Sequence, residues 1–384
     1  MNEKISLDNV LNQMKKNLKA ALLANAQEPI FFESILYSER DLLPLEGKYI
    51  FRRTWLYIGD STSLSQPGDV LVTEAADSSI LIVRSQDGNL KAFHNVCPHR
   101  ASLLCANSGI QQLKQFICPY HAWVFNLEGQ LIGTPHLEGL PALFRQEDYS
   151  LKPLRCEQWQ GFIFVSFTDN VPPLREFLGD IPSLLGGHRT KATKLLVKKQ
   201  YRVACNWKTF HDNTLCDYHL PAVHPKTLNP VQGPVHLYEH HFSEYVNLLY
   251  TPTTSQWREK HQVLEHLTER IRLGNFTYGI FPNLHLVALP NGMLGWLRID
   301  PITVDTCQVN LEIYGIPGIT EKPAQLEAGF DAVTHEDIAI TEGVQRGYAS
   351  GAYTPGVAHQ LEARIIHHQR LIRRFLLAGI GVKE

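Results

Sequence analysis

No stretch of the 384-residue chain approaches the ~20 consecutive apolar residues that a membrane-spanning helix needs. The formal net charge is only −2, so no surplus of positive charge favours binding to nucleic acid or to an anionic membrane. The apolar stretch 20–23 is shorter than the ~7–15 residues at the centre of a signal peptide. Seven cysteines, an odd number, in a chain without an expected export signal predict free thiols in a cytoplasmic protein.

The composition that remains is that of a globular protein, with 44% hydrophobic and 19% charged residues and enough length for two cores. We expect a helical arm over 1–48 whose first helix is amphipathic, with apolar positions at Ile5, Val10, Leu11, Met14, Leu18 and Leu22. Short β-like segments predict an all-β domain over 49–170, and Asp87 with Gly88 after an apolar run predicts a hairpin. Over 171–384, strands at 195–204, 242–250, 284–289 and 309–314 and helices at 206–219, 262–273, 323–345 and 356–377 predict an α+β domain.

Two short cysteine–histidine pairs lie in the expected β domain. Cys97 and His99 form the first pair, and Cys118 and His121 form the second after a gap of 18 residues. Two thiolates and two imidazoles are the ligand set of a Rieske [2Fe–2S] cluster, in which two histidines replace two cysteines on one iron. Zinc accepts the same four ligands, but zinc fingers usually separate the cysteines from the histidines, whereas each arm here carries one of each.

A second histidine pair predicts another metal site in the α+β domain. His219 and His224 are five residues apart, and on one continuous helix they would point about 140° apart. Pro221 resolves this difficulty, because it ends a helix and would let His224 fold back toward His219. Two imidazoles and one carboxylate form the facial triad of non-haem Fe(II) oxygenases.

The third ligand is predicted to be Asp337. It lies in an apolar stripe of one helix formed by Phe330, Val333, Ile340 and Val344. A carboxylate on a buried stripe is costly unless it is paired or bound to a metal. Glu336 is rotated about 100° from the stripe and is expected in solvent. The alternative is that Asp337 pairs with an arginine such as Arg346.

The chain resembles the large (α) subunit of the Rieske non-haem iron oxygenases. The resemblance runs from about residue 30 to the C-terminus and includes the two cluster motifs, Trp207 with Lys208, the histidine pair and Asp337. It implies a helix-grip-like catalytic domain, O₂ and a small organic substrate, and electrons from an NAD(P)H-dependent flavin/iron–sulfur reductase, sometimes through a ferredoxin. It also implies a homotrimer in which the cluster of one subunit supplies the iron of the next.

One position departs from the family pattern. The resemblance places an acidic residue three positions before the first iron-binding histidine, where it bridges to a cluster histidine of the neighbouring subunit. Here that position is Cys216, and a thiol is a weak hydrogen-bonding group. We therefore expect the bridge to be absent or to pass through Asp212 or Asp217. On a continuous helix Asp212 shares a face with Cys216 and His219, whereas Asp217 does not.

The substrate is less well defined by the sequence. Within the family, the overall pattern is similar to the branch that acts on quaternary ammonium compounds. The resemblance implies that such a substrate is hydroxylated or oxidatively dealkylated. The alternative is the cis-dihydroxylation of an aromatic ring. Five aromatic residues could form a cation-binding cage or belong to the sheet core: Phe276, Tyr278, Phe281, Trp296 and Tyr314. Two other classes compete: a Rieske electron carrier without oxygenase chemistry, and a non-catalytic subunit with a degenerate iron site.

Overall fold

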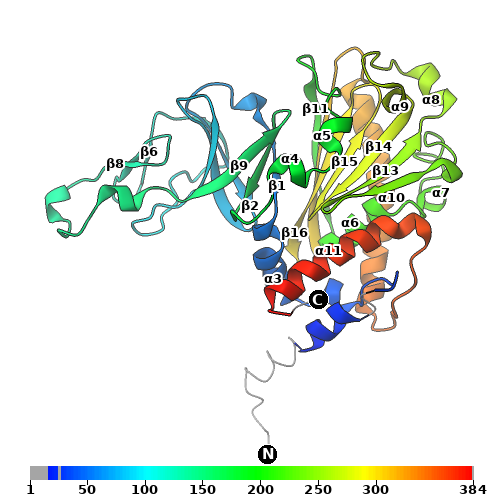
Figure 1. Ribbon diagram of the computed structural model, residues 1–384, viewed down its shortest axis with the longest axis horizontal. Helices are drawn as coiled ribbons and strands as arrows, with labels where there is room; N and C mark the ends of the chain where they lie inside the picture. The colour runs from blue at the N-terminus through cyan, green and yellow to red at the C-terminus, as the bar shows by residue number, and fades with distance from the viewer. Residues whose placement is uncertain (1–15, 25–26, 383–384) are drawn as a thin grey trace, which may run out of the picture. The chain divides into compact units, whose positions relative to one another are not determined.

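The structure of the protein, a computed structural model, describes residues 16–24 and 27–382. The chain forms two compact units, one made of residues 51–176 and the other of the residues up to 50 together with 177–384 (Figure 1). Of the expected first helix, Ile5, Val10, Leu11 and Met14 lie outside the described residues. Leu18 and Leu22 lie on a helix and are buried.

The unit of residues 51–176 is built from antiparallel strands. Its larger sheet has the order β1-β10-β9-β4-β3-β2-β5, and a smaller sheet has the order β6-β7-β8. The strands are β1 Leu56–Asp60, β2 Asp69–Ala75, β3 Ser78–Arg84, β4 Leu90–His94, β5 Gly109–Gln112, β6 Phe116–Ile117, β7 Val124–Phe125, β8 Leu131–Gly133, β9 Pro153–Trp159 and β10 Phe162–Ser166. The hairpin predicted at Asp87 and Gly88 is confirmed, because β3 and β4 pair antiparallel and Gly88 takes a φ of 80° between them.

The other unit contains a seven-stranded antiparallel sheet of order β11-β17-β16-β15-β14-β13-β12. Its strands are β11 Lys194–Val203, β12 Glu239–Phe242, β13 Val246–Pro252, β14 Gly274–Ile280, β15 Leu284–Ala288, β16 Leu294–Thr303 and β17 Thr306–Gly315. The helices are α2 Ile35–Ser38, α3 Leu42–Tyr49, α5 Ile181–Leu184, α6 Trp207–Leu215, α7 Leu220–Val223, α8 Ser255–Lys260, α9 Glu269–Arg272, α10 Pro323–Ala349 and α11 Ala363–Gly379, with α4 Leu174–Phe177 at the boundary between the units. Antiparallel sheets with separate helices confirm the α+β prediction.

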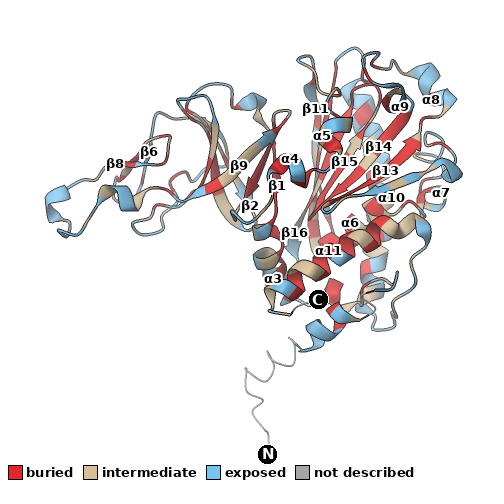
Figure 2. Ribbon diagram, in the orientation of Figure 1, coloured by how far each residue is buried: buried red, intermediate tan, exposed pale blue. Residues whose placement is uncertain are grey.

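Three helices pack against this sheet. Helix α6 contacts β15 to β17, α10 contacts β11 and α11 contacts β13, and the central strands are largely buried (Figure 2). The sequence prediction of a helix over 262–273 is wrong for most of its length, since only α9 forms there. The helix predicted from 356 begins at Ala363 instead.

Helix α10 buries a different face from the one that we expected. Ile340 and Val344 are 43% and 39% exposed, whereas Thr341 and Gln345 are buried. The Oε1 atom of Gln345 accepts a hydrogen bond from the backbone N–H of Asn206 at 2.9 Å. The buried face is therefore partly polar, because it satisfies the backbone at the start of α6.

Candidate functional site

The two cluster motifs form loops with the same backbone hydrogen bonds. In each loop the backbone N–H of the cysteine donates to the carbonyl five positions later, at 2.8 Å. Cys97 donates to Ser102, and Cys118 donates to Trp123. In each loop the backbone N–H of the alanine four positions after the cysteine donates to the cysteine carbonyl at 3.0 Å. These alanines, Ala101 and Ala122, have φ values of 59° and 53°. The left-handed conformation closes both loops and brings the next residues back toward the cysteine.

The four candidate cluster ligands lie together at these loops. The rings of His99 and His121 have centroids 4.6 Å apart, and His99 stacks on Trp123 at 4.6 Å. Cys97 and Cys118 are both buried. The Nδ1 atom of His121 is buried and has no hydrogen-bond partner, as is expected for an atom reserved for a metal. Two thiols and two imidazoles in this arrangement fit a Rieske cluster.

Backbone N–H groups also point at the two sulfur atoms. Burial raises the pKa of the Cys97 thiol. Burial acts in the same direction on Cys118, but the N–H groups of His121 and Tyr120 lower its pKa below the usual value. Hydrogen bonds to a sulfur stabilise its thiolate form, which is the form that binds iron.

The histidine pair of the α+β unit flanks a single helical turn. Helix α6 ends at Leu215 because Cys216 has an extended backbone, so the helix predicted to reach His219 is shorter than expected. His219 is the N-cap of α7, His224 is its C-cap, and Pro221 lies in the first turn. The prediction that Pro221 ends a helix is therefore wrong. It begins one, since proline fits the first turn, where no backbone N–H bond is lost.

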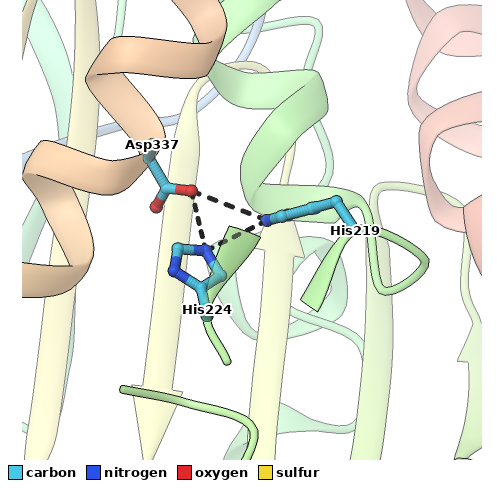
Figure 3. Close-up of side chains that lie close together, drawn as sticks. All are labelled: His219, His224 and Asp337. Atoms are coloured by element: carbon cyan, nitrogen blue, oxygen red, sulfur yellow. Dashed lines mark hydrogen bonds and ion pairs between the residues drawn. The ribbon is translucent and has the colours of Figure 1, made fainter. Parts of the chain in front are cut away.

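Three side chains converge at this point (Figure 3). The Nε2 atoms of His219 and His224 are 3.2 Å apart. The Oδ1 atom of Asp337 lies 3.0 Å from Nε2 of His224 and 3.5 Å from Nε2 of His219. Donor atoms about 2.1 Å from a shared ion, at right angles to one another, would lie roughly 3.0 Å apart. The three donors are thus spaced for one face of a metal ion, and they are of the types that suit Fe(II).

Two further side chains hold these donors in place. Glu336 accepts a hydrogen bond from Nδ1 of His224 at 2.7 Å and another from Thr227 at 2.7 Å. Glu336 does reach solvent as expected, with 33% of its side chain exposed, but the contact with His224 was not foreseen. Asn213 donates to Oδ1 of Asp337 at 2.7 Å. The general rule that a metal-bound histidine donates its other N–H to a carboxylate could have identified Glu336 in the sequence.

The electrostatics of the triad reflect the same contacts. Burial favours the neutral form of His224, but hydrogen bonds to Asp337 and Glu336 outweigh it and raise the pKa of His224. Burial alone would raise the pKa of Asp337, and the hydrogen bonds from His219, His224 and Asn213 instead lower it. Asp337 is therefore a carboxylate at neutral pH, and it does not pair with Arg346 in these contacts.

The two acidic residues proposed for the bridge, Asp212 and Asp217, each bond to side chains outside the triad. The carboxylate of Asp212 accepts hydrogen bonds from Tyr37 at 2.6 Å and Gln369 at 2.9 Å. Asp217 is buried, with Arg364 at 3.2 Å and His240 at 2.9 Å from its oxygens. Because α6 ends before Cys216, the helical face that we expected Asp212 and His219 to share does not exist.

The thiol of Cys216 faces a residue that the sequence analysis missed. Its sulfur lies 3.8 Å from Oε1 of Glu362, just before α11. Burial is the main cause that raises the pKa of Cys216 to about 12, so this thiol is neutral at physiological pH. No local sequence signal places Glu362 here, because 146 positions separate the two residues in the chain.

A cavity of about 230 Å³ adjoins the triad. Its lining is mostly apolar, with aromatic side chains from Phe210, Trp257 and Phe330. Polar groups enter at Asn275, whose Oδ1 atom has no hydrogen-bond partner, and at His285, whose burial lowers its pKa to about 3. The five aromatic residues considered for a cage do not line this cavity and are all buried: Phe276, Tyr278, Phe281, Trp296 and Tyr314. They belong to the sheet core.

No helix in the described part of the chain is long and apolar enough to cross a membrane. Family models match two segments, the Rieske [2Fe-2S] domain at residues 54–144 and the ring hydroxylating alpha subunit (catalytic domain) at 192–378.

Curated relatives match nearly the whole chain. The glycine betaine monooxygenase oxygenase subunit of Pseudomonas aeruginosa is 26% identical over 92% of this chain and 90% of its own length. The carnitine monooxygenase oxygenase subunit of Escherichia coli (strain K12) is 29% identical over 86% of this chain and 87% of its own length.

Solved structures share the architecture. A quaternary ammonium Rieske monooxygenase in complex with L-carnitine has a TM-score of 0.76 and 25% identity, covering 93% of this chain and 98% of that one. A naphthalene 1,2-dioxygenase from Rhodococcus sp. has a TM-score of 0.79 at 17% identity, covering 95% of this chain and 99% of that one, which is a likeness of fold. The chain therefore belongs to the Rieske non-haem iron oxygenases, as an oxygenase α subunit with a Rieske [2Fe–2S] domain and a mononuclear iron domain.

Proposed function

We propose that this oxygenase hydroxylates or oxidatively dealkylates a small quaternary ammonium compound. Relatives named for glycine betaine and carnitine at 26% and 29% identity support this substrate class. The single observation that carries the proposal is the convergence of His219, His224 and Asp337 beside an apolar cavity. An aromatic cis-dihydroxylation is less well supported, because the naphthalene dioxygenase likeness extends to the fold alone.

We assign Cys97, His99, Cys118 and His121 to the cluster, and the triad to the iron. When bound, the cluster supplies single electrons and the iron activates O₂. The protein contributes the remaining functions. Glu336 orients His224, and Asn213 orients Asp337, so the donor atoms that would hold the iron keep their positions beside the cavity.

The cavity lining supports substrate binding and the exclusion of water. Apolar side chains enclose most of the surface, which favours the methyl groups of an ammonium head. Trp257 and Phe330 provide aromatic faces, to which a cation is attracted. Asn275 offers an unpartnered carboxamide oxygen to a hydrogen-bond donor of the substrate.

Membership of the family implies a reductase as the electron donor. We assign that role to an NAD(P)H-dependent flavin/iron–sulfur protein, with or without a ferredoxin.

We also infer a homotrimer. An exposed tyrosine precedes a histidine at each candidate metal site: Tyr120, 53% exposed, before His121, and Tyr218, 55% exposed, before His219. Both surfaces are suited to contact a second copy of the chain.

The seven cysteines form no disulfide, which fits a reducing compartment that we take to be the cytoplasm.

The test is product analysis with purified, iron-loaded protein, a chemical reductant and O₂. We expect formation of an aldehyde or hydroxylated product from choline, glycine betaine or carnitine, coupled to O₂ consumption. Wild-type protein is compared with His224→Ala, which retains the cluster ligands. Turnover of simple aromatic acids in place of every ammonium compound would contradict the proposal. Light scattering would separately measure whether the protein is trimeric.

A further inference from the structure

A second cavity lies next to the cavity at the triad. We call the 230 Å³ space beside His219, His224 and Asp337 the inner cavity. The outer cavity, about 440 Å³, is bounded by residues of α10, by the segment 226–231 and by residues around the turn between β15 and β16. Six residues line both cavities: Leu228, Val231, Leu289, Met293, Phe330 and Val333. All six are hydrophobic, so the two cavities adjoin at apolar side chains.

We propose that the outer cavity is a second substrate subsite, which holds an apolar tail of an ammonium compound whose N-methyl head lies in the inner cavity. This inference rests on the proposed function and deepens it by naming the kind of substrate. The inner cavity is the smaller of the two, at about 230 Å³ against about 440 Å³. A longer substrate therefore has to extend past the shared residues, and the surface that it meets there is apolar.

The charged residues of the two linings agree with an ammonium head in the inner cavity and a tail in the outer cavity. No lysine or arginine lines the inner cavity in the part of the chain that the structure describes. The outer cavity has Lys226 and Glu321 at its boundary. Glu321 is already engaged, with His261 at 2.8 Å and Asn291 at 3.1 Å. Lys226, which lines only the outer cavity, is thus the cation available to a polar end of the tail.

Gly329 offers a way to fill the outer cavity alone. It lies on α10 and lines the outer cavity but not the inner one. Apart from the backbone of its own helix, a Cβ atom at this position would meet nothing within 4 Å, so the position has open space for a side chain. Gly329→Leu should therefore occupy the space proposed for the tail. Gly347, on the same helix, also has open space at its Cβ and lines neither cavity, so Gly347→Leu is a matched control.

The experiment measures binding by calorimetry to the full-length, iron-loaded protein without turnover. The probes are tetramethylammonium and the butyl, hexyl and octyl trimethylammonium ions. For wild type and Gly347→Leu we expect affinity to rise about fourfold for each methylene that becomes buried. In Gly329→Leu the rise should stop once the inner cavity is full, while tetramethylammonium binds as in wild type.

The outcomes separate this inference from the proposed function. If tetramethylammonium binds but longer tails give no gain in wild type, the outer cavity is not a subsite and the ammonium site stands. An equal gain in wild type and Gly329→Leu also overturns the inference. If no ammonium ion binds the iron-loaded protein at all, the proposed substrate class fails and the inference fails with it.

Discussion

The Oε2 atom of Glu336 lies 2.7 Å from Nδ1 of His224, on the opposite edge of the imidazole from the nitrogen that faces Asp337. This contact fixes the ring orientation. With the Nδ1 proton given to Glu336, neutral His224 would offer the lone pair of Nε2 to a bound metal. Removing the carboxylate in Glu336→Ala should weaken iron binding about 10- to 100-fold. Glu336→Gln should have a smaller effect, because the amide oxygen can still accept the hydrogen bond.

The measurement is iron retention during titration with a chelator. Glu327→Gln is the control, since this exposed residue of the same helix pairs with Lys199 and lies outside the triad contacts. Equal iron retention in Glu336→Ala and wild type would show that the Glu336 contact is not needed to hold the metal.

Two alanines in the cluster loops have left-handed backbones. An L-residue in this conformation costs roughly 1–2 kcal/mol, and glycine avoids most of this cost but loses more entropy on folding. Ala101→Gly and Ala122→Gly should each stabilise the Rieske unit by up to about 1 kcal/mol. Ala328→Gly, within the exposed part of α10, should have the opposite sign, by about 1 kcal/mol.

Thermal unfolding tests this prediction, followed by the visible absorbance of the cluster for the two loop variants and by far-ultraviolet circular dichroism for Ala328→Gly. A lower unfolding temperature for Ala122→Gly would mean that the alanine methyl group has a packing role that outweighs its backbone strain.

Cys216 provides a neutral thiol where the family pattern has a carboxylate. We predict that this limits electron transfer, so Cys216→Asp should speed the oxidation of the reduced cluster in a single turnover. The nearby Glu362 would repel the new carboxylate and raise the pKa of one of the pair. The double variant Cys216→Asp/Glu362→Gln removes this complication.

Stopped-flow absorbance of the cluster gives the rate, and Cys216→Ser is the uncharged control. An unchanged or slower rate in both aspartate variants would remove the idea that Cys216 limits transfer.

A buried ion pair connects α3 to the start of α6. The side chains of Lys208 and Glu46 are each 1% exposed and are hydrogen-bonded to each other, and Trp207 also donates to Glu46 at 2.8 Å. Glu46→Ala leaves a buried ammonium without its partner and should destabilise this unit by about 3–5 kcal/mol. Replacing both charges in Glu46→Leu/Lys208→Met should restore much of this loss.

Urea denaturation followed by tryptophan fluorescence measures both effects. If Glu46→Ala unfolds at the same urea concentration as wild type, the pair does not contribute to the stability of the unit.

The sequence was informative where ligands lie close together in the chain. The spacing of Cys97 to His121 and the α+β pattern predicted the cluster loops and the fold class. The structure also brings His219 and His224 to Asp337, although our account of Pro221 was wrong. Helix α6 stops at Leu215, before Pro221: the backbone of Cys216 is extended, and the N–H of Asp217 donates to the carbonyl of Leu361 from a distant segment.

The remainder of the site depends on contacts between distant segments. Glu362 reaches Cys216 from the start of α11, and the cavity combines strands, α8 and α10. Hydrophobic periodicity places residues on a face but does not reveal which other segment covers it. For this reason the periodicity predicts Ile340 and Val344 in the core, although both are exposed.

The central claim is that one chain holds both a mixed-ligand iron–sulfur cluster and a separate iron ion. The direct measurement is iron content per chain together with the electron paramagnetic resonance spectrum of the reduced protein, for wild type and His224→Ala. We predict about three irons in wild type and two in the variant, with the same cluster spectrum in both. An equal iron content in the two proteins, or zinc in place of the cluster, would contradict the account.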